Sequence, residues 1–182
     1  METTTAITQV PPHGESPTSS TDAVAEPSAA PTRRVDHLLR VSTRVARPRE
    51  EVFAFFADAA NLGAVTPPAL HFRIRTPVPI EMREGALIDY TIGLYGIPLH
   101  WRTEITRWEP PVSFEDTQLR GPYSTWVHRH LFRDDGDGTI IDDEVRYALP
   151  FGVLGRLVHP LVRWQLQRIF RYRQDAVARL LA

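Results

Sequence analysis

Six short runs with the character of β-strands follow one another with no helix between them, and one long helical segment closes the chain. The runs are separated by turn-forming residues, such as Gly121-Pro122 and the stretch from Asp134 to Gly138. Connections this short join antiparallel neighbours, because parallel neighbours need a longer crossover. The pattern therefore predicts an antiparallel meander, with strands at about residues 70–76, 86–95, 98–108, 112–119, 124–133 and 139–149.

The segments on either side of the meander complete the predicted fold. Residues 38–45 alternate as a strand should, and Pro48 followed by two glutamates begins a helix that favours negative charge in its first turn. A second short helix or turn ends at Pro67-Pro68. Residues 153–181 have a helical period, with His159-Pro160 expected to separate a short turn from the main helix. We predict an α+β fold: a curved antiparallel sheet of about seven strands wrapped around the C-terminal helix, with two short helices after strand 1.

Residues 1–32 differ in composition from the rest of the chain. They hold many Ser, Thr, Pro and Ala, no arginine and no large aromatic residue. Such a segment buries too little apolar surface to offset its chain entropy, so we expect a disordered tail. Residues 33–182 are predicted to form a single domain.

Composition excludes several classes of chemistry. The chain has no cysteine, and all 21 of its basic residues are arginine. Disulfides, thiolate catalysis, lysine Schiff bases and P-loop nucleotide sites are therefore absent. The formal net charge of −1 indicates no nucleic-acid partner, and no apolar run is long enough for membrane insertion. Without cysteine or a secretory signal, we expect a cytoplasmic protein.

The hairpin around the Asp-Gly-rich turn has a readable register. If Arg133 pairs with Ile140, His130 lies opposite Asp143 and Trp126 lies opposite Tyr147. Alternation along the strand then places Trp126 and His130 on the face toward the core, together with His128. The preceding strand brings Asp116 close to His128.

The predicted inner surface is aromatic and aliphatic with one polar patch, which is the usual composition of a small-molecule pocket. Arg173 lies within the apolar stripe of the C-terminal helix, so it needs Asp143, Asp116 or a ligand carboxylate as its partner. The candidate ligand-binding residues are Tyr90, Trp101, Phe114, Asp116, Gln118, Trp126, His128, His130, Tyr147 and Arg173.

Several of these segments also resemble a known superfamily. They are the Glu50-Glu51-Val52-Phe53 helix start, the run GPYSTWVHRH from Gly121 to His130, Thr139-x3-Asp143-x3-Tyr147, and Ile169-Phe170-x2-Arg173. Over residues 36–181 the chain resembles the SRPBCC or START-like helix-grip superfamily, and within it the polyketide cyclase/dehydrase-like ligand-binding proteins of bacteria. The resemblance implies the helix-grip fold, which accommodates binders, carriers and enzymes alike.

The polar patch allows three interpretations. It is a buried hydrogen-bonded network that orients strands or ligand, an acid–base site in which Asp143 orients His130 with His128 beside it, or a metal site. We predict a protein that binds or carries a small, largely hydrophobic molecule, with no metal and no cofactor. The alternative is a polyketide cyclase/dehydratase-like enzyme with the catalytic residues His130, Asp143 and His128. The sequence indicates no oligomeric state.

Overall fold

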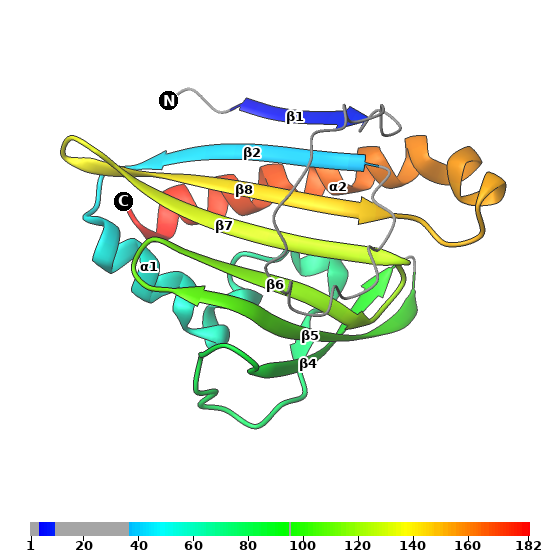
Figure 1. The fold of residues 1–182 in the computed structure, drawn as a ribbon, viewed down its shortest axis with the longest axis horizontal. Helices are drawn as coiled ribbons and strands as arrows, with labels where there is room; N and C mark the ends of the chain where they lie inside the picture. Colours follow the sequence, from blue (N-terminus) through cyan, green and yellow to red (C-terminus); the bar gives the residue numbers. More distant parts are fainter. Residues whose placement is uncertain (1–3, 10–36, 95) are drawn as a thin grey trace, which may run out of the picture.

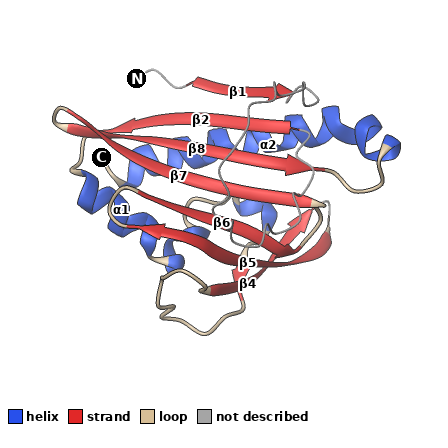
Figure 2. Ribbon diagram, viewed as in Figure 1, coloured by secondary structure: helices blue, strands red, loops and turns tan. Residues whose placement is uncertain are grey.

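The computed structural model describes residues 4–9, 37–94 and 96–182, which form one eight-stranded antiparallel sheet and a long C-terminal helix (Figures 1 and 2). The strands lie in the order β1-β2-β8-β7-β6-β5-β4-β3. Their bounds are β1 Thr4–Gln9, β2 His37–Val45, β3 Arg73–Ile74, β4 Leu87–Leu94, β5 Ile97–Glu109, β6 Ser113–Arg120, β7 Thr125–Asp135 and β8 Gly138–Ala148. The helices are α1 Arg49–Ala57, the short 3-10 turns η1 Ala59–Gly63 and η2 Pro68–Leu70, and α2 Val153–Leu180. The predicted α+β architecture is confirmed.

Seven of the eight strands are the predicted ones, and the eighth comes from the predicted tail. Thr4–Gln9 pairs antiparallel with β2 along the edge of the sheet. Its three threonines and one isoleucine suit a strand, a local preference that the average composition of the tail conceals. The rest of the predicted disordered segment lies outside the described residues, and the domain boundary at residue 33 stays a prediction.

The sheet covers α2, which runs behind it in Figure 1, and the core fills the space between them. Phe53 of α1 packs with Phe132 and Ile141 in one buried cluster. Leu39 and Tyr147 pack with residues of α2 in a second buried cluster. Burying these two clusters is the dominant favourable contribution to folding.

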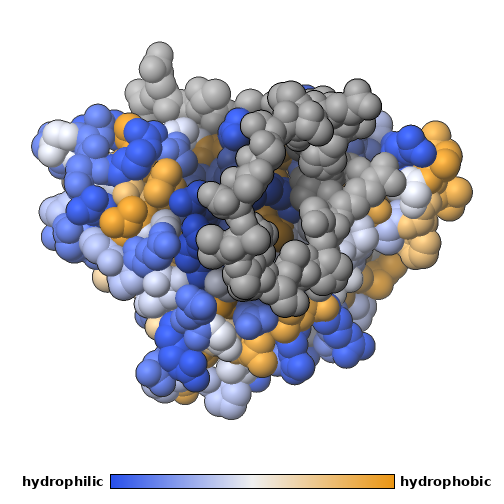
Figure 3. All heavy atoms as spheres, in the orientation of Figure 1, coloured by the Kyte–Doolittle hydropathy of each residue, from blue (hydrophilic) through white to orange (hydrophobic). Residues whose placement is uncertain are grey.

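The first turns of α2 extend past the sheet. Leu154 and Leu157 are exposed there, as is Phe151 just before the helix, and hydrophobic residues gather at this end in Figure 3. The helix runs without a break through Pro160, where the sequence predicted a separation. Pro160 is exposed, so water can bond the carbonyl that its missing N–H leaves unpaired. None of the described helices is both long and apolar enough to cross a bilayer.

The register of the β7–β8 hairpin is the predicted one. Arg133 pairs with Ile140, His130 with Asp143 and His128 with Val145. On the outer face of the hairpin, Arg133 forms an ion pair with Asp142 at 2.7 Å. The alternation that puts this charged pair outside therefore puts both histidines inside.

Candidate functional site

A cavity of about 200 Å³ lies between the sheet, α1 and α2. Its walls are mostly apolar and come from the inner faces of β4 to β7, from α1 and η1, and from α2. The lining side chains include Phe56, Leu62, Ile88, Tyr90, Trp101, Phe114, Tyr123, Trp126, Leu166, Ile169 and Phe170. The volume suits a ligand smaller than a drug-sized molecule.

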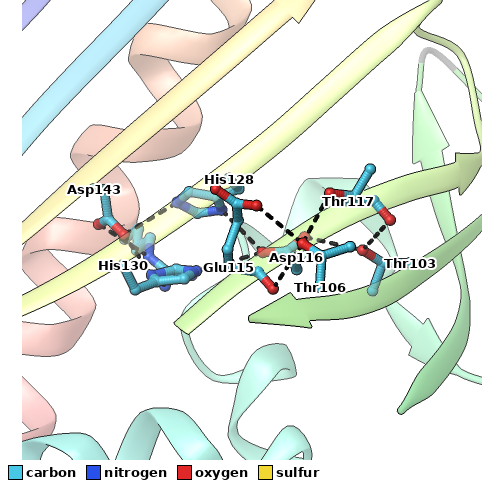
Figure 4. A network of polar contacts seen from close by, with 9 residues as sticks. Thr103, Thr106, Glu115, Asp116, Thr117, His128, His130 and Asp143 are labelled. Carbon is cyan, nitrogen blue, oxygen red and sulfur yellow. Dashed lines mark hydrogen bonds and ion pairs between the residues drawn. The ribbon is translucent and has the colours of Figure 1, made fainter. Parts of the chain in front are cut away.

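One wall of the cavity carries a polar cluster contributed by three adjacent strands (Figure 4). Asp116 comes from β6, His128 and His130 come from β7, and Asp143 comes from β8. Strand pairing sets Asp116 opposite His128 and His130 opposite Asp143. The cluster is thus held by backbone hydrogen bonds on both sides of β7, which fixes its geometry more firmly than loops would.

Asp143 connects the two histidines. Its Oδ1 atom lies 2.7 Å from Nδ1 of His130 and 3.1 Å from Nε2 of His128. A carboxylate oxygen only accepts, so both imidazoles donate an N–H to this one atom. The contact therefore fixes the tautomer of each ring when the ring is neutral: Nδ1–H for His130 and Nε2–H for His128.

The remaining nitrogen of each ring faces Asp116. The Oδ2 atom of Asp116 lies 3.5 Å from Nε2 of His130 and 3.6 Å from Nδ1 of His128. The other oxygen of Asp116 accepts a hydrogen bond of 3.0 Å from the Thr103 hydroxyl. The two rings themselves lie in contact, with centroids 3.9 Å apart.

Arg173 of α2 lies against the cluster without closing a strong hydrogen bond. Its Nε is 3.6 Å from Oδ2 of Asp143, and its guanidinium carbon is 5.0 Å from the ring centroid of Phe56. Nη2 of Arg173 lies 3.5 Å from Nδ1 of His130. This contact is not a hydrogen bond, because Nδ1 already donates its N–H to Asp143. Nε of Arg173 is buried and has no hydrogen-bond partner among the described residues.

The charges move the pKa values of the pair that Arg173 contacts. Burial would raise the pKa of Asp143, but Arg173, His130 and the histidine hydrogen bonds together hold it well below its usual range. Burial would lower the pKa of His130, but the charge of Asp143 and the bond to Asp116 raise it overall. Both shifts favour the ionised form of Asp143 and the protonated form of His130.

The pKa values of His128 and Asp116 are both lowered. Burial and the charge of His130 lower the pKa of His128, and Asp143 only partly offsets them. Burial opposes ionisation of Asp116, but His130 and His128 lower its pKa. With His128 neutral, the charges of the two carboxylates are balanced by Arg173 and His130. The surroundings therefore move the pKa values of the two imidazoles in opposite directions, an arrangement that acid–base chemistry can use.

Most of the predicted site residues line the cavity. They are Tyr90, Trp101, Phe114, Asp116, Trp126, His128, His130 and Arg173. Asp143 lies behind the two histidines and completes the cluster.

Two predicted ligand contacts are placed elsewhere. The Gln118 amide donates to the Tyr123 carbonyl at 2.7 Å, so it braces the turn before β7 instead of lining the cavity. Tyr147 is fully buried behind the wall, and its hydroxyl lies 3.1 Å from Nε2 of His159. In each case the strand alternation correctly predicted a buried side chain, but that side chain forms a hydrogen bond to a neighbouring polar group instead of reaching the cavity.

Sequence reasoning missed other lining residues. Phe56 comes from α1, and Phe170 comes from the apolar stripe of α2, while Tyr123 comes from a turn. Tyr123 lies within the GPY segment that the resemblance already rested on, which was the signal available for it. Which side of α1 faces the cavity depends on how the helix packs, and its sequence is apolar on more than one side.

Comparisons with known proteins give no match to a family model and none to a curated protein. Solved structures do match. The Zhui aromatase/cyclase from Streptomyces sp. R1128 superposes with a TM-score of 0.63 at 14% identity, over 78% of this chain and 90% of that one. The protein Ms6760 from Mycobacterium smegmatis gives 0.61 at 18% identity, over 79% of this chain and 90% of its own. Ara h 8.0201 gives 0.54 at 15% identity, over 77% of this chain and 96% of its own.

This protein has the helix-grip fold. The superpositions confirm the predicted resemblance at the level of fold, and identities this low carry nothing further. In this helix-grip chain the gripped helix is α2, and the cavity lies between α2 and the face of the sheet that bears the His–Asp cluster.

Proposed function

We propose that the protein binds or carries a small, largely hydrophobic molecule in the cavity between the sheet and α2. The observation that supports this most directly is the composition of the walls, where aromatic and aliphatic side chains surround a single polar cluster. Apolar walls supply affinity by removing ligand surface from water, while a few convergent polar groups fix orientation.

Arg173 is the group that would orient the ligand. Its Nε is buried and lacks a hydrogen-bond acceptor among the described residues, although Asp143 lies 3.6 Å away. A ligand oxygen that reached this N–H would satisfy a donor that is otherwise costly to bury. We therefore propose a ligand with an apolar body and a carbonyl, carboxylate or hydroxyl at one end.

A cavity-filling variant tests the location. Ile169→Trp on α2 would place an indole in the cavity, whereas Leu157→Asn changes an exposed position on the same helix. We expect titration with an apolar fluorescent dye to show binding to the wild type and to Leu157→Asn, and strongly reduced binding to Ile169→Trp. Equal binding by all three would place the dye outside the cavity, and loss only in Leu157→Asn would place it on the exposed end of α2. Either result contradicts the proposal. Circular dichroism checks that each variant is folded.

Native mass spectrometry of the gently purified full chain tests the ligand itself. We expect a bound mass that disappears on denaturation and is recovered by solvent extraction. The carrier proposal is abandoned if the protein stays empty and also fails to bind the dye.

A second candidate is a polyketide cyclase/dehydratase-like reaction in the same cavity, favoured by the 2.7 Å contact between His130 and Asp143. In such a step one group removes a proton next to a carbonyl, another protonates the leaving hydroxyl, and water departs. The test incubates the recovered ligand with protein and follows loss of water by mass. If the site is catalytic, His130→Ala ends turnover while binding survives. Retained turnover in His130→Ala removes His130 from the mechanism.

A further inference from the structure

Three potential ligand atoms face one another inside the cavity: Oδ2 of Asp116, Nδ1 of His128 and Nε2 of His130. Each of the three residues offers one ligand atom that lies within 4.8 Å of the other two. Asp116 is 3.5 and 3.6 Å from the two nitrogens, which is longer than an ion-paired hydrogen bond between such groups. The two imidazole nitrogens thus face the same carboxylate oxygen without bonding strongly to it.

The two distances from Asp116 to the histidine nitrogens resemble those between two ligand atoms of one metal ion. Zn²⁺ binds histidine nitrogen and carboxylate oxygen at about 2.0–2.2 Å in a tetrahedral arrangement. The distance between two ligand atoms of such a tetrahedron is about 1.63 bond lengths, roughly 3.3–3.6 Å. Both measured distances to Asp116 lie at or near this range.

The other side of each ring is already arranged as metal ligands require. Metal-binding histidines donate their second N–H to a carboxylate or carbonyl, which fixes the tautomer and aims the free lone pair at the ion. Asp143 accepts from both rings, at 2.7 Å for His130 and 3.1 Å for His128. Thr103 holds the Asp116 carboxylate in the same manner, through a bond of 3.0 Å. Figure 4 shows these supporting contacts from β5 across to β8.

We propose that Asp116, His128 and His130 form a binding site for a divalent transition-metal ion, with Zn²⁺ as the ion whose ligand geometry fits best. The metal ion would displace the proton of His130, because a ligating imidazole must be neutral. With both histidines neutral, the two carboxylates and Arg173 leave the cluster with one negative charge, which attracts a cation. Two nitrogens and one oxygen are borderline ligands, suited to zinc and its first-row neighbours and unlike the all-oxygen sites of calcium and magnesium.

The protein supplies three ligands, so a fourth position stays open. The three residues line the cavity, and the open position therefore faces the space that a ligand would occupy. This is the arrangement of catalytic zinc sites, in which water or substrate takes the fourth position. The metal site rests on the three ligand residues and on the supporting Asp143 and Thr103, and it is independent of the proposed hydrophobic ligand.

The test uses the untagged full chain, freed of metal with a chelator and titrated with Zn²⁺ against a chromophoric competitor. We expect one Zn²⁺ per chain. Co²⁺ as a second probe is expected to give the intense visible absorption of tetrahedral coordination. Asp116→Asn and His130→Ala are expected to lose tight binding. Asp143→Asn keeps all three ligand residues but removes the carboxylate that accepts from both rings, and is expected to weaken binding roughly 10–100-fold.

The controls are His71→Ala and His100→Ala, which change exposed histidines elsewhere on the molecule. Both are expected to bind Zn²⁺ as the wild type does, and circular dichroism confirms that each variant is folded. The proposal is overturned if the wild type binds no Zn²⁺, if Asp116→Asn binds with unchanged affinity, or if an exposed-histidine variant loses the ion. The dye titration has a separate readout, so failure of the metal site leaves the cavity test standing.

Discussion

His130 and Asp143 lie directly opposite each other on β7 and β8, with the imidazole Nδ1 2.7 Å from the carboxylate Oδ1. Both side chains are almost completely buried. Taking such charges out of water is costly, and their mutual contact, the hydrogen bond from His128 and the nearby Arg173 and Asp116 compensate for it. Removing one member therefore leaves its partner buried without this counter-charge and affects folding stability.

Asp143→Asn is expected to destabilise the protein strongly. The change leaves Arg173 and His130 without their carboxylate in a buried setting, which costs about 3–5 kcal/mol. The matched control is Asp142→Asn on the outer face, where the pair with Arg133 is exposed and contributes about 1 kcal/mol or less. Urea denaturation followed by circular dichroism measures both. Equal losses of unfolding free energy in the two variants would show that the buried contacts of Asp143 stabilise the protein no more than an exposed ion pair does.

Acid is expected to remove the stability that Asp143 contributes. Its folded-state pKa is held well below the usual value, so the contribution is fully present above about pH 4 and is lost as pH falls through the folded pKa. The measurement is the urea midpoint at a series of pH values in the presence of a metal chelator. The wild-type curve should fall below pH 4, and the Asp143→Asn curve should be flatter there. If the two curves of urea midpoint against pH run parallel, groups other than Asp143 cause the loss of stability in acid.

Thr103→Val is expected to cost about 1.5–3 kcal/mol, because it removes the hydroxyl that donates to the buried side of Asp116. Thr106→Val is the control on the same strand. Thr106 is exposed and bonds Glu115 on the outer face, so its loss should change stability by about 0.5 kcal/mol or less. Thermal denaturation compares the two. A Thr106→Val effect as large as that of Thr103→Val would contradict the assignment of inner and outer faces.

Gly138→Ala is expected to disturb the start of β8. A Cβ at this position would overlap the carbonyl oxygen of Val45 on β2, so the two strands must move apart. We expect a loss of about 1–3 kcal/mol from overpacking. At Gly63 the nearest atom to an added Cβ is 3.7 Å away, so Gly63→Ala should be tolerated better. Chemical denaturation of both variants decides, and a Gly138→Ala protein as stable as Gly63→Ala would refute the steric argument.

The sequence predicted the register of the site because two independent signals agreed. The Asp-Gly turn fixed where β7 and β8 reverse, and strict alternation fixed which face is apolar. His130 opposite Asp143 follows from counting along the two strands, and the structure places them so. Asp116 opposite His128 followed from the same alternation on β6.

Other features depend on packing that no local pattern encodes. His37 and His159 were single histidines in the sequence, yet their rings stack at 3.5 Å, and Tyr147 bonds to His159 instead of facing the cavity. Alternation correctly buried Tyr147, but it could not show which polar group would meet the hydroxyl.

The metal geometry was equally out of reach of the sequence. Two histidines separated by one residue are what plain alternation produces on any strand, so the sequence predicted no metal. Only three-dimensional distances reveal that the free nitrogens of His128 and His130 converge on Asp116. The carboxylate that orients both rings comes from the next strand, 13 residues beyond His130 in the chain.

Because the cluster alternates along β7, the length of this hairpin can change only in even steps. Deleting one residue between His130 and the turn while keeping the pairing with β8 would swing Arg129 into the cavity and both histidines out to solvent. Deleting two residues would restore the original facing. Natural relatives and engineered versions that keep the cluster should therefore differ in this segment by pairs of residues, or carry a bulge that absorbs the odd one.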